Sequence, residues 1–554
     1  MKKNKASSTG NPDPLDNRPD APADPSRRRL FEGLAAIGAS TMLPLSTNAA
    51  ATSRTGSLDN RLKEKVKHVV VIYLENRSFN NLFAAFPGLK SPLSDASIEP
   101  QKDRDGSELT TLPKVWGGMV QRGQSVGGQH YLIKEDDISG LPNAPWVLKD
   151  KNNAPLPESI ITRDLWHLFY QNQMQINGGK NDSFVAWADS GGLPMGYYSE
   201  THKNLNLWAI AQQFTLCDNF FMAAFGGSYL NHQFLISART PEYFNAHETA
   251  AKKKIAVLDD GPTGYRLTVD PASPDSALAG PPKFVNNGAI TPDGFAVNTM
   301  APPYQPSFVR PAEGGDDRYA DPNDPSTLPP QTYDTIGDRL SAKGISWAWY
   351  GGAWQTALNG KGGGHLPNFQ YHHQPFNYFK RYAPDTDART RHLRDGGVGD
   401  SPISNKFLAD VVAGKLPPVT FYKPQGNLNL HAGYSDVESG DHHVANVLQH
   451  LMSSPQWKNM VVIITFDENG GWWDHIAPPK GDRWGPGSRI PAIIVSPFAK
   501  KGYVDHTLYD TTSIIRFLSR RFDLPDLEGV KLRNEAFLAR GATPPGDLTE
   551  ALQL

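Results

Sequence analysis

Residues 68–76 have the sequence HVVVIYLEN, a nearly unbroken run of apolar and mostly β-branched residues that ends in a carboxylate and a carboxamide. Such a run is typical of a strand buried on both faces of a parallel sheet. Residues 460–471, MVVIITFDENGG, repeat the arrangement, with a mostly apolar run leading straight into Asp467 and Glu468. Because open α/β sheets bind ligands outside the carboxyl ends of their strands, we expect the two polar clusters to converge on one site.

Further strand and helix patterns alternate along the chain and predict an α/β fold with a mainly parallel sheet. The candidate strands are residues 215–222, 345–350, 419–422 and 490–495, and the candidate helices are residues 204–213, 333–342, 442–452 and 511–521. Residues 91–160 and the Pro-, Asp- and Gly-rich residues 258–332 break the alternation. We interpret both as long insertions at the rim of the core that shape substrate access.

The composition of the 554-residue chain is that of a globular enzyme. Hydrophobic residues make up 38% of it, enough to fill a large core, and the formal net charge of −2 gives no overall attraction to nucleic acid. We therefore expect no nucleic-acid partner. Cys217 is the only cysteine, so no intramolecular disulfide can form, and we expect its side chain to pack as a small apolar group.

The N-terminal residues have the pattern of an export signal. Arg27, Arg28 and Arg29 precede a mildly apolar stretch, residues 34–45, and small residues follow at 49–51. Paired arginines before a weakly apolar region are typical of a twin-arginine signal; a basic N-terminal arm is the alternative. The signal predicts recognition by the twin-arginine export machinery, a mature protein that begins near residue 50, and a periplasmic or secreted location without a stable membrane anchor.

These patterns predict three parts of the chain. They are a signal peptide at residues 1–50, a catalytic domain at residues 51–540 with insertions near 91–160 and 258–332, and a Pro-rich tail at residues 541–554 that we expect to extend over the surface.

The two acidic clusters point to a metal site. Glu75 and Asn76 offer hard oxygen ligands of the kind that Ca²⁺, Mg²⁺ or Mn²⁺ accept, and Asp467 and Glu468 add two carboxylates. Three carboxylates gathered without a cation would repel one another, and a bound divalent metal resolves that conflict. For Glu75 and Asn76 alone, the favoured explanation is a strand-end turn in which Asn76 caps the next helix and Glu75 forms an ion pair, and the second acidic cluster shifts the balance toward a metal site. The metal identity stays open.

Ser228 follows two glycines, between a predicted strand and a predicted helix, in the sequence AFGGSYLNH of residues 224–232. Backbone amides at a helix start can cradle an oxyanion while the serine hydroxyl faces it. A helix N-cap after a Gly-rich turn is the structural alternative. The segment also lacks the second glycine of the Gly-x-Ser-x-Gly elbow of α/β-hydrolases.

Histidines supply the proton donors that phosphoryl transfer needs. The candidates are His167, the adjacent pair His372 and His373, and His431. His442 and His443 begin a predicted helix, and we expect them to have a structural role and no catalytic one. His475, beside the second acidic cluster, is given no role. Imidazolium groups that bind phosphate would give an acidic activity optimum if their pKa stays near 6.5.

Together these motifs resemble a bacterial phosphoesterase family that unites acid phosphatases with non-zinc phospholipases C, over roughly residues 66–525. The matching elements are residues 75–79 (ENRSF), 467–471 (DENGG) with 473–475 (WDH), and the strand at 490–497. Residues 175–180 (QINGGK), 225–228 (FGGS) and the His372-His373 pair bring the chain closer to the acid phosphatases.

The resemblance implies an alkaline-phosphatase-like core, a mainly parallel β-sheet flanked by helices. It implies Ser228 as nucleophile and metal ligand, with Glu75, Asn76, Asp467 and Glu468 completing the metal site, and it places His167, His372, His373 and His431 around the phosphate. Asn80 departs from the pattern, since many relatives have aspartate there, and we expect this to change a contact behind the metal ligands.

The sequence thus predicts a metal-dependent acid phosphatase that hydrolyses phosphomonoesters through a phosphoserine intermediate. Two alternatives remain. A phospholipase C that cleaves phospholipid head groups would use the same residues with a wider entrance, and a periplasmic protein that binds phosphate esters or metal would not turn them over.

Overall fold

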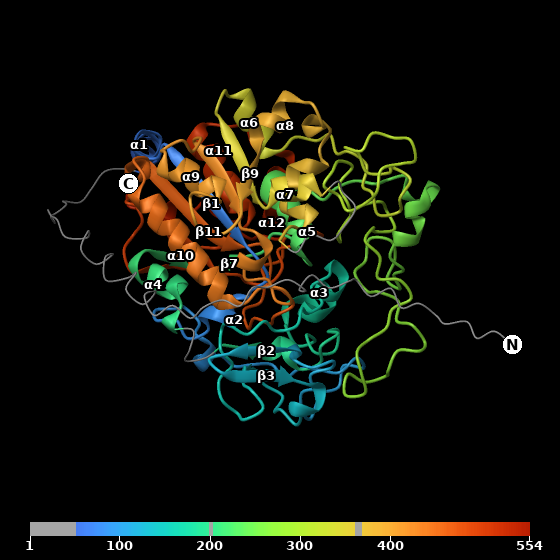
Figure 1. The fold of residues 1–554 in the computed structure, drawn as a ribbon. Helices are drawn as coiled ribbons and strands as arrows, with labels where there is room; N and C mark the ends of the chain where they lie inside the picture. Colours follow the sequence, from blue (N-terminus) through green and yellow to red (C-terminus); the bar gives the residue numbers. More distant parts are fainter. Residues whose placement is uncertain (1–50, 199–202, 361–367) are drawn as a thin grey trace.

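The structure is a computed structural model that describes residues 51–198, 203–360 and 368–554 (Figure 1). The predicted twin-arginine signal at residues 1–50 and its cleavage region lie outside these residues. In the described part of the chain, none of the helices combines the length and the apolar character that a membrane crossing requires.

An eight-stranded sheet forms the centre of the molecule, in the order β13-β6-β12-β11-β1-β10-β8-β9. Its strands are β1 (His68–Leu74), β6 (Thr215–Cys217), β8 (Trp347–Gly352), β9 (Leu393–Gly397), β10 (Val419–Lys423), β11 (Met460–Phe466), β12 (Ala492–Val495) and β13 (Tyr503–Asp505). Only β12 runs antiparallel to its neighbours. The predicted α/β fold with a mainly parallel sheet is confirmed.

β1 and β11 lie side by side in the middle of this sheet, although nearly 400 residues separate them in the chain. They pair in parallel from His68 with Met460 to Leu74 with Phe466, so both strands end at the same edge. Their apolar side chains are almost fully buried, and each such burial stabilises the fold by about 1.5–3 kcal/mol. A charged residue in place of Val71 would break the centre of the core.

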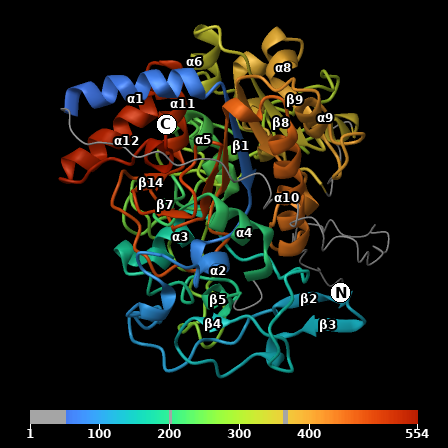
Figure 2. The same cartoon turned by 90° about the vertical axis from the view of Figure 1, so that its left-hand side faces the viewer.

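Helices cover both faces of the sheet. Figure 2 shows α1 (Ala51–Lys65), α11 (Thr512–Phe522) and α12 (Glu528–Ala539) on one side of β1, and α10 (Val437–Ser453) on the other. α10 begins five residues before the predicted start at residue 442, because the Asp436 carboxylate accepts a hydrogen bond from Ser439 N (2.6 Å) and caps the first turn.

Further helices and short strands complete the structure. They are α2 (Phe79–Phe83), α3 (Phe169–Ile176), α4 (Asn206–Gln213), α5 (Ser228–Ser237), α6 (Ile336–Ala342), α7 (Trp354–Asn359), α8 (Asp387–His392), α9 (Lys406–Val412), β2 (Val120–Val126), β3 (Gln129–Ile133), β4 (Trp146–Val147), β5 (Gly196–Tyr197), β7 (Phe220–Phe221) and β14 (Tyr509–Asp510). The predicted strand at 215–222 is split, since β6 joins the main sheet and β7 pairs with β14.

Both expected insertions lie outside the main sheet. Residues 91–160 carry the β2–β3 hairpin at the bottom of Figure 1, and residues 258–332 form coil with isolated β-bridges and no helix or strand. The tail differs from our expectation of a surface extension. Leu548 and Leu552 are buried, and Leu552 bridges to Ala499, because these apolar side chains cover the edge near β13.

Cys217 lies at the end of β6, fully buried and unpaired, as expected for a small apolar residue. Burial raises the pKa of its thiol, which keeps the group neutral.

Candidate active site

Glu75 and Asn76 lie directly beyond the carboxyl end of β1, next to the corresponding end of β11. The backbone of Asn76 is left-handed (φ 59°), a conformation that Asn tolerates, and its N–H donates to Asp467 Oδ1 (3.1 Å). Gly470 packs against this turn, where a Cβ atom would lie 2.4 Å from the carbonyl oxygen of Asn76. Only glycine therefore lets the two polar clusters approach so closely.

Ser228 is the first residue of α5, and its hydroxyl points into the polar cluster. Oγ lies 3.1 Å from Glu75 Oε2, 3.3 Å from Glu468 Oε1 and 3.4 Å from Asn76 Oδ1, and its one proton can be donated to any one of them. The N-cap of α5 is Gly227, so the alternative that Ser228 caps this helix does not hold. The hydroxyl lies at the positive end of the α5 dipole, which favours an anion beside it.

The three carboxylates of the cluster have no exposed surface. Burial would raise the pKa of Glu75, but the Lys423 ammonium group (2.5 Å from Oε1) and the His373 ring outweigh it and hold this pKa well below its ordinary value. Burial, and then the charge of Glu75, raise the pKa of Asp467 well above the ordinary value, and burial does the same for Glu468. Ionising all three carboxylates at once is therefore unfavourable unless a further cation compensates their charge.

His167 and His431 lie on the other side of Asn76. His431 Nε2 is 3.1 Å and His167 Nε2 is 3.4 Å from the amide nitrogen of Asn76. His431 Nδ1 donates to the carbonyl oxygen of Ala432, and His167 Nδ1 donates to that of Leu165 (2.6 Å). Both rings thus turn Nε2 toward the cluster.

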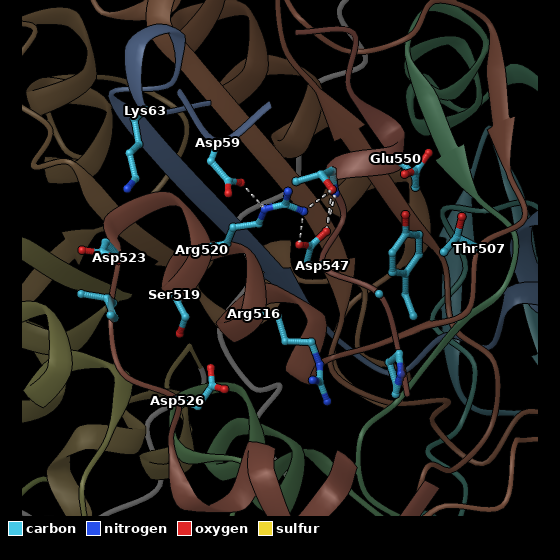
Figure 3. A pocket seen from close by; sticks show the side chains of 15 residues that line it. Asp59, Lys63, Thr507, Arg516, Ser519, Arg520, Asp523, Asp526, Asp547 and Glu550 are labelled. Atoms are coloured by element: carbon cyan, nitrogen blue, oxygen red, sulfur yellow. Dashed lines mark hydrogen bonds and ion pairs between the residues drawn. The ribbon is translucent and has the colours of Figure 1, made fainter. Parts of the chain in front are cut away.

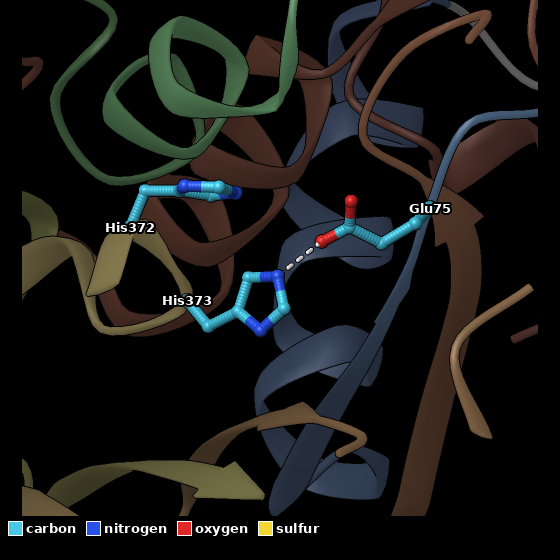
Figure 4. A group of neighbouring side chains, drawn as sticks. All are labelled: Glu75, His372 and His373. Carbon is cyan, nitrogen blue, oxygen red and sulfur yellow. Dashed lines mark ion pairs between the residues drawn. The ribbon is translucent and has the colours of Figure 1, made fainter. Parts of the chain in front are cut away.

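His372 and His373 approach Glu75 from a separate segment (Figure 4). His373 Nε2 lies 2.7 Å from Glu75 Oε1, and the His372 ring stands at right angles to that of His373, with ring centroids 4.9 Å apart. The structure therefore brings all nine residues predicted for the site into one cluster.

Burial lowers the pKa of His372, His373 and His431, that of His373 to about 4. The His373 ring is therefore neutral near pH 6 in the ligand-free site, and His372 and His431 hold a proton less readily than a free imidazole does. The acidic optimum expected from an unperturbed pKa of 6.5 does not follow from them.

The spacing of the oxygen atoms fits a metal ion. Oγ of Ser228 lies 3.1–3.4 Å from one oxygen each of Glu75, Asn76 and Glu468. Two oxygens at right angles around a cation, each about 2.3 Å from it, lie about 3.3 Å apart. Asp467 Oδ2 is also buried and has no hydrogen-bond partner among the described residues.

The orientation of the Asn76 amide supports the same conclusion. His431 Nδ1 donates to Ala432, and burial lowers the pKa of the ring, which favours an unprotonated Nε2 that accepts from the Asn76 nitrogen. The Asn76 oxygen then faces the carboxylates, an arrangement that a cation stabilises. The reverse orientation would let the nitrogen donate to Glu468 (2.9 Å) and Glu75 (3.1 Å), but it needs His431 as an imidazolium.

Groups that include histidine could also hold a metal. They are Glu75 with His372 and His373, Glu75 with His232 and Asp467, and Asp164 with His167 and His431. Oxygen-rich sets suit Ca²⁺, Mg²⁺ or Mn²⁺, whereas imidazole suits Zn²⁺ and related ions. The described residues therefore include groups that could hold a metal ion.

Two members of the cluster were not predicted from the sequence. Lys423 ends β10 and pairs with Glu75, and His232, one turn into α5, donates from Nδ1 to the backbone oxygen of Ser228 (2.7 Å). The signal for Lys423 was a lysine at the end of a buried strand. The signal for His232 was its i+4 spacing from Ser228 on a predicted helix.

Asn80 lies behind the cluster, as expected. Its Oδ1 accepts from Arg489 (3.1 Å) and lies 3.0 Å from His475 Nδ1, while its buried Nδ2 has no partner among the described residues. Arg489 also pairs with Asp474 (3.1 Å). An aspartate at position 80 would also accept from Arg489, so the departure alters a supporting contact. His475 belongs to this support, and its Nε2 donates to the carbonyl oxygen of Ser91 (3.1 Å).

A hollow of about 680 Å³ lies elsewhere, between α1, α11 and the C-terminal segment (Figure 3). Residues such as Asp59, Arg516, Arg520 and Asp547 line it, and none of the predicted site residues does. This hollow is therefore separate from the candidate site.

Comparison with known proteins places the chain in a family. The model of the phosphoesterase family matches residues 66–525. A non-hemolytic phospholipase C of Pseudomonas aeruginosa is 24% identical over 535 residues, which cover 89% of this chain but only 60% of that protein. Phospholipase C B of Mycobacterium tuberculosis is 24% identical over 495 residues, with 83% and 74% covered.

Among solved structures, an alkaline phosphatase superfamily protein from Vibrio parahaemolyticus covers 69% of this chain and 67% of its own, with 11% identity and a TM-score of 0.27. A TM-score of 0.27 is too low to establish a shared fold. The family match spans both acidic motifs and most of the sheet, and it shows that this chain belongs to the phosphoesterase family.

Proposed function

We propose that this chain is a metal-dependent phosphoric-ester hydrolase with Ser228 as its nucleophile. The observation that carries the proposal is the placement of Ser228 Oγ at the start of α5, 3.1–3.4 Å from oxygens of Glu75, Asn76 and Glu468. In this proposal Glu75, Asn76, Ser228, Asp467 and Glu468 hold one divalent cation. When bound, the cation supplies positive charge that favours the serine alkoxide and the phosphate oxygens.

The serine attacks phosphorus in line with the ester bond. The Ser228 hydroxyl gives its proton to His431 Nε2, which carries a lone pair, and Oγ forms a bond to phosphorus as the bond to the leaving oxygen breaks. His431 then gives the proton to the leaving alcohol. Water attacks the phosphoserine in the second half and loses a proton to His431, which gives that proton to Ser228 Oγ as the bond between Oγ and phosphorus breaks.

The remaining histidines bind and orient the phosphate. His167, His372 and His373 approach the cluster from two directions and can donate to phosphate oxygens. His373 also holds Oε1 of Glu75, so that Oε2 stays near Ser228.

The names of the relatives favour a phospholipase C over the acid phosphatase expected from the sequence. A feature of the rim supports a large substrate: Phe284, from the insertion at 258–332, packs against Trp166 and Trp187, both with ring centroids 6.2 Å away. Trp166 is next to His167, so partly exposed aromatic groups border the site. They would contact an apolar or cationic leaving group.

We also propose that the twin-arginine pattern exports the folded protein to the periplasm or beyond. Replacing Arg27, Arg28 and Arg29 by lysine should leave the protein in the cytoplasm, as measured by cell fractionation. Unchanged export would contradict this part of the proposal.

Two measurements test the function. The first compares p-nitrophenol release from p-nitrophenylphosphorylcholine and from p-nitrophenyl phosphate at pH 6. An excess on the choline diester supports the phospholipase C, and an excess on the monoester supports the acid phosphatase. The second is mass spectrometry after acid quenching during turnover, which should find phosphate on Ser228 with the monoester, or phosphorylcholine on Ser228 with the choline diester. No release from either substrate and no phosphoserine would favour the binding-protein alternative.

A further inference from the structure

Lys423 is a buried cation at the proposed metal site. It follows Tyr422, which pairs with Ile72 of β1, so Lys423 lies beside Tyr73. Glu75 is two residues beyond Tyr73 and shares its face of the sheet. Lys423 Nζ lies 2.5 Å from Glu75 Oε1 and 5.3 Å from the centre of the Tyr73 ring, and the side chain has no exposed surface.

Lys423 and Ser228 contact different oxygens of Glu75. Oε1 meets Lys423 Nζ and His373 Nε2, while Oε2 lies 3.1 Å from Ser228 Oγ. This division fixes the rotation of the carboxylate. Arg77 is also buried nearby, but it donates to Leu430 O and Asn81 Oδ1 and to none of the three carboxylates.

The charges of the cluster can be counted. In the ionised form that binds a cation, Glu75, Asp467 and Glu468 contribute −3 and Lys423 contributes +1, which leaves −2. A divalent cation would neutralise this charge, and a trivalent cation would exceed it. In a buried site, one unit of uncompensated charge has a large cost.

Resting on the proposed function, we propose that Lys423 is a positioning residue that orients Glu75 and sets the charge of the oxygen cluster, and so selects a divalent over a trivalent cation. The role is separate from the chemical step, because Lys423 reaches Ser228 only through Glu75.

Competition binding of Ca²⁺ and Tb³⁺ to metal-free protein tests the proposal, because the two ions are similar in size and differ in charge. The readout is the ratio of their Kd values, followed by Tb³⁺ luminescence. Lys423→Met should shift the ratio toward Tb³⁺ by about tenfold or more. Lys423→Arg keeps the charge and should keep the wild-type ratio. Tyr422→Phe alters the same strand away from the cluster and should also leave it unchanged.

A second pair of variants gives the opposite sign. Glu75→Gln removes one negative charge and should shift the ratio toward Ca²⁺ by about tenfold. The double variant Lys423→Met/Glu75→Gln restores the charge of −2 and should return to the wild-type ratio. Because it removes both members of a buried ion pair, it leaves neither of them without its partner and is expected to fold even where Lys423→Met does not.

The inference is overturned if Lys423→Met has the wild-type ratio, or if Glu75→Gln and the double variant have the same ratio. Its failure is distinguishable from failure of the proposed function. If wild-type protein forms phosphoserine and binds Ca²⁺ but these ratios do not move, only the role of Lys423 is wrong. If wild-type protein binds neither ion, the metal site and this inference both fail.

Discussion

The molecule contains two polar regions whose charged groups differ in burial and in pairing. In the hollow of Figure 3, charges are partly exposed and form pairs, such as Arg520 with Asp59 (2.7 Å) and with Asp547 (2.8 Å). In the Ser228 cluster, three carboxylates are fully buried, Lys423 pairs with Glu75, and Asp467 Oδ2 has no hydrogen-bond partner among the described residues. The hollow also contains a cation, Arg516, whose buried Nε and Nη2 have no hydrogen-bond partner in the described part of the chain, but its carboxylates are partly or fully exposed. The gathering of fully buried carboxylates around Ser228 therefore marks the functional candidate.

Loss of the nucleophile should have the largest effect. Ser228→Ala should lower kcat by at least about a thousandfold, because no other group near the cluster can form the ester intermediate. Ser237→Ala, at the other end of α5, and Arg520→Ala, in the hollow, should retain turnover. Wild-type turnover by folded Ser228→Ala protein would remove the distinction between the two regions.

Substitution of Gly470, which packs against the backbone of Asn76, should have the next largest effect on activity. Gly470→Ala places a Cβ atom against the backbone of Asn76 and should lower kcat by about 10- to 100-fold, since displaced groups catalyse poorly. Gly261 is the control, because it too has a positive φ (94°) but has no heavy atom within 4 Å of an added Cβ. If Gly261→Ala lowers activity equally, backbone strain and not contact with Asn76 explains the loss.

Removal of metal should lower the stability of the protein through the Ser228 cluster and not through the hollow. Chelation should lower Tm by several degrees, because a bound cation stabilises the folded state in proportion to its binding, and re-addition should restore it. The Arg520→Ala variant should show the same decrease in Tm on chelation, since the substituted residue lies in the hollow and not in the Ser228 cluster. An unchanged Tm, with metal loss verified by elemental analysis, would contradict a structural contribution of the metal.

Substitution of an acidic residue in the hollow, Asp547, should have the smallest effect, which is a change in the free energy of unfolding. Burial would raise the pKa of Asp547, but Thr549 and Arg520 outweigh it and lower this pKa. Ionised Asp547 therefore stabilises the fold above the unfolded pKa of about 4, and this contribution disappears as pH falls through the lower folded pKa. Asp547→Asn should cost about 1 kcal/mol at pH 7 and progressively less below pH 4, as measured by denaturation at several pH values.

Asp526→Asn is the matched control for that series. Asp526 lines the same hollow and forms no ion pair with the described residues, so its replacement should leave the pH dependence as in the wild type. A cost of Asp547→Asn that stays constant from pH 7 to pH 3 would show that charge is not the cause.

The sequence predicted the parts of the site that lie inside local motifs. The runs before Glu75 and Asp467 identified buried strands, and their polar ends identified the edge of the sheet. Lys423 could not be assigned in this way, because its contact with Glu75 depends on β10 lying next to β1. The lowered pKa values of His373 and His431 depend on burial by distant segments, and the packing of Leu552 depends on the edge that it covers.

The central position of β1 affects how the chain is made. Its neighbours are β10 and β11, which begin at Val419 and Met460. At about 5–20 residues per second, synthesis leaves β1 without either partner for roughly 20–70 s. For that time an apolar strand with two unpaired edges is exposed. The ribosome-bound chain should therefore be a client of chaperones that hold extended apolar segments, and its active site is completed only in the last part of synthesis.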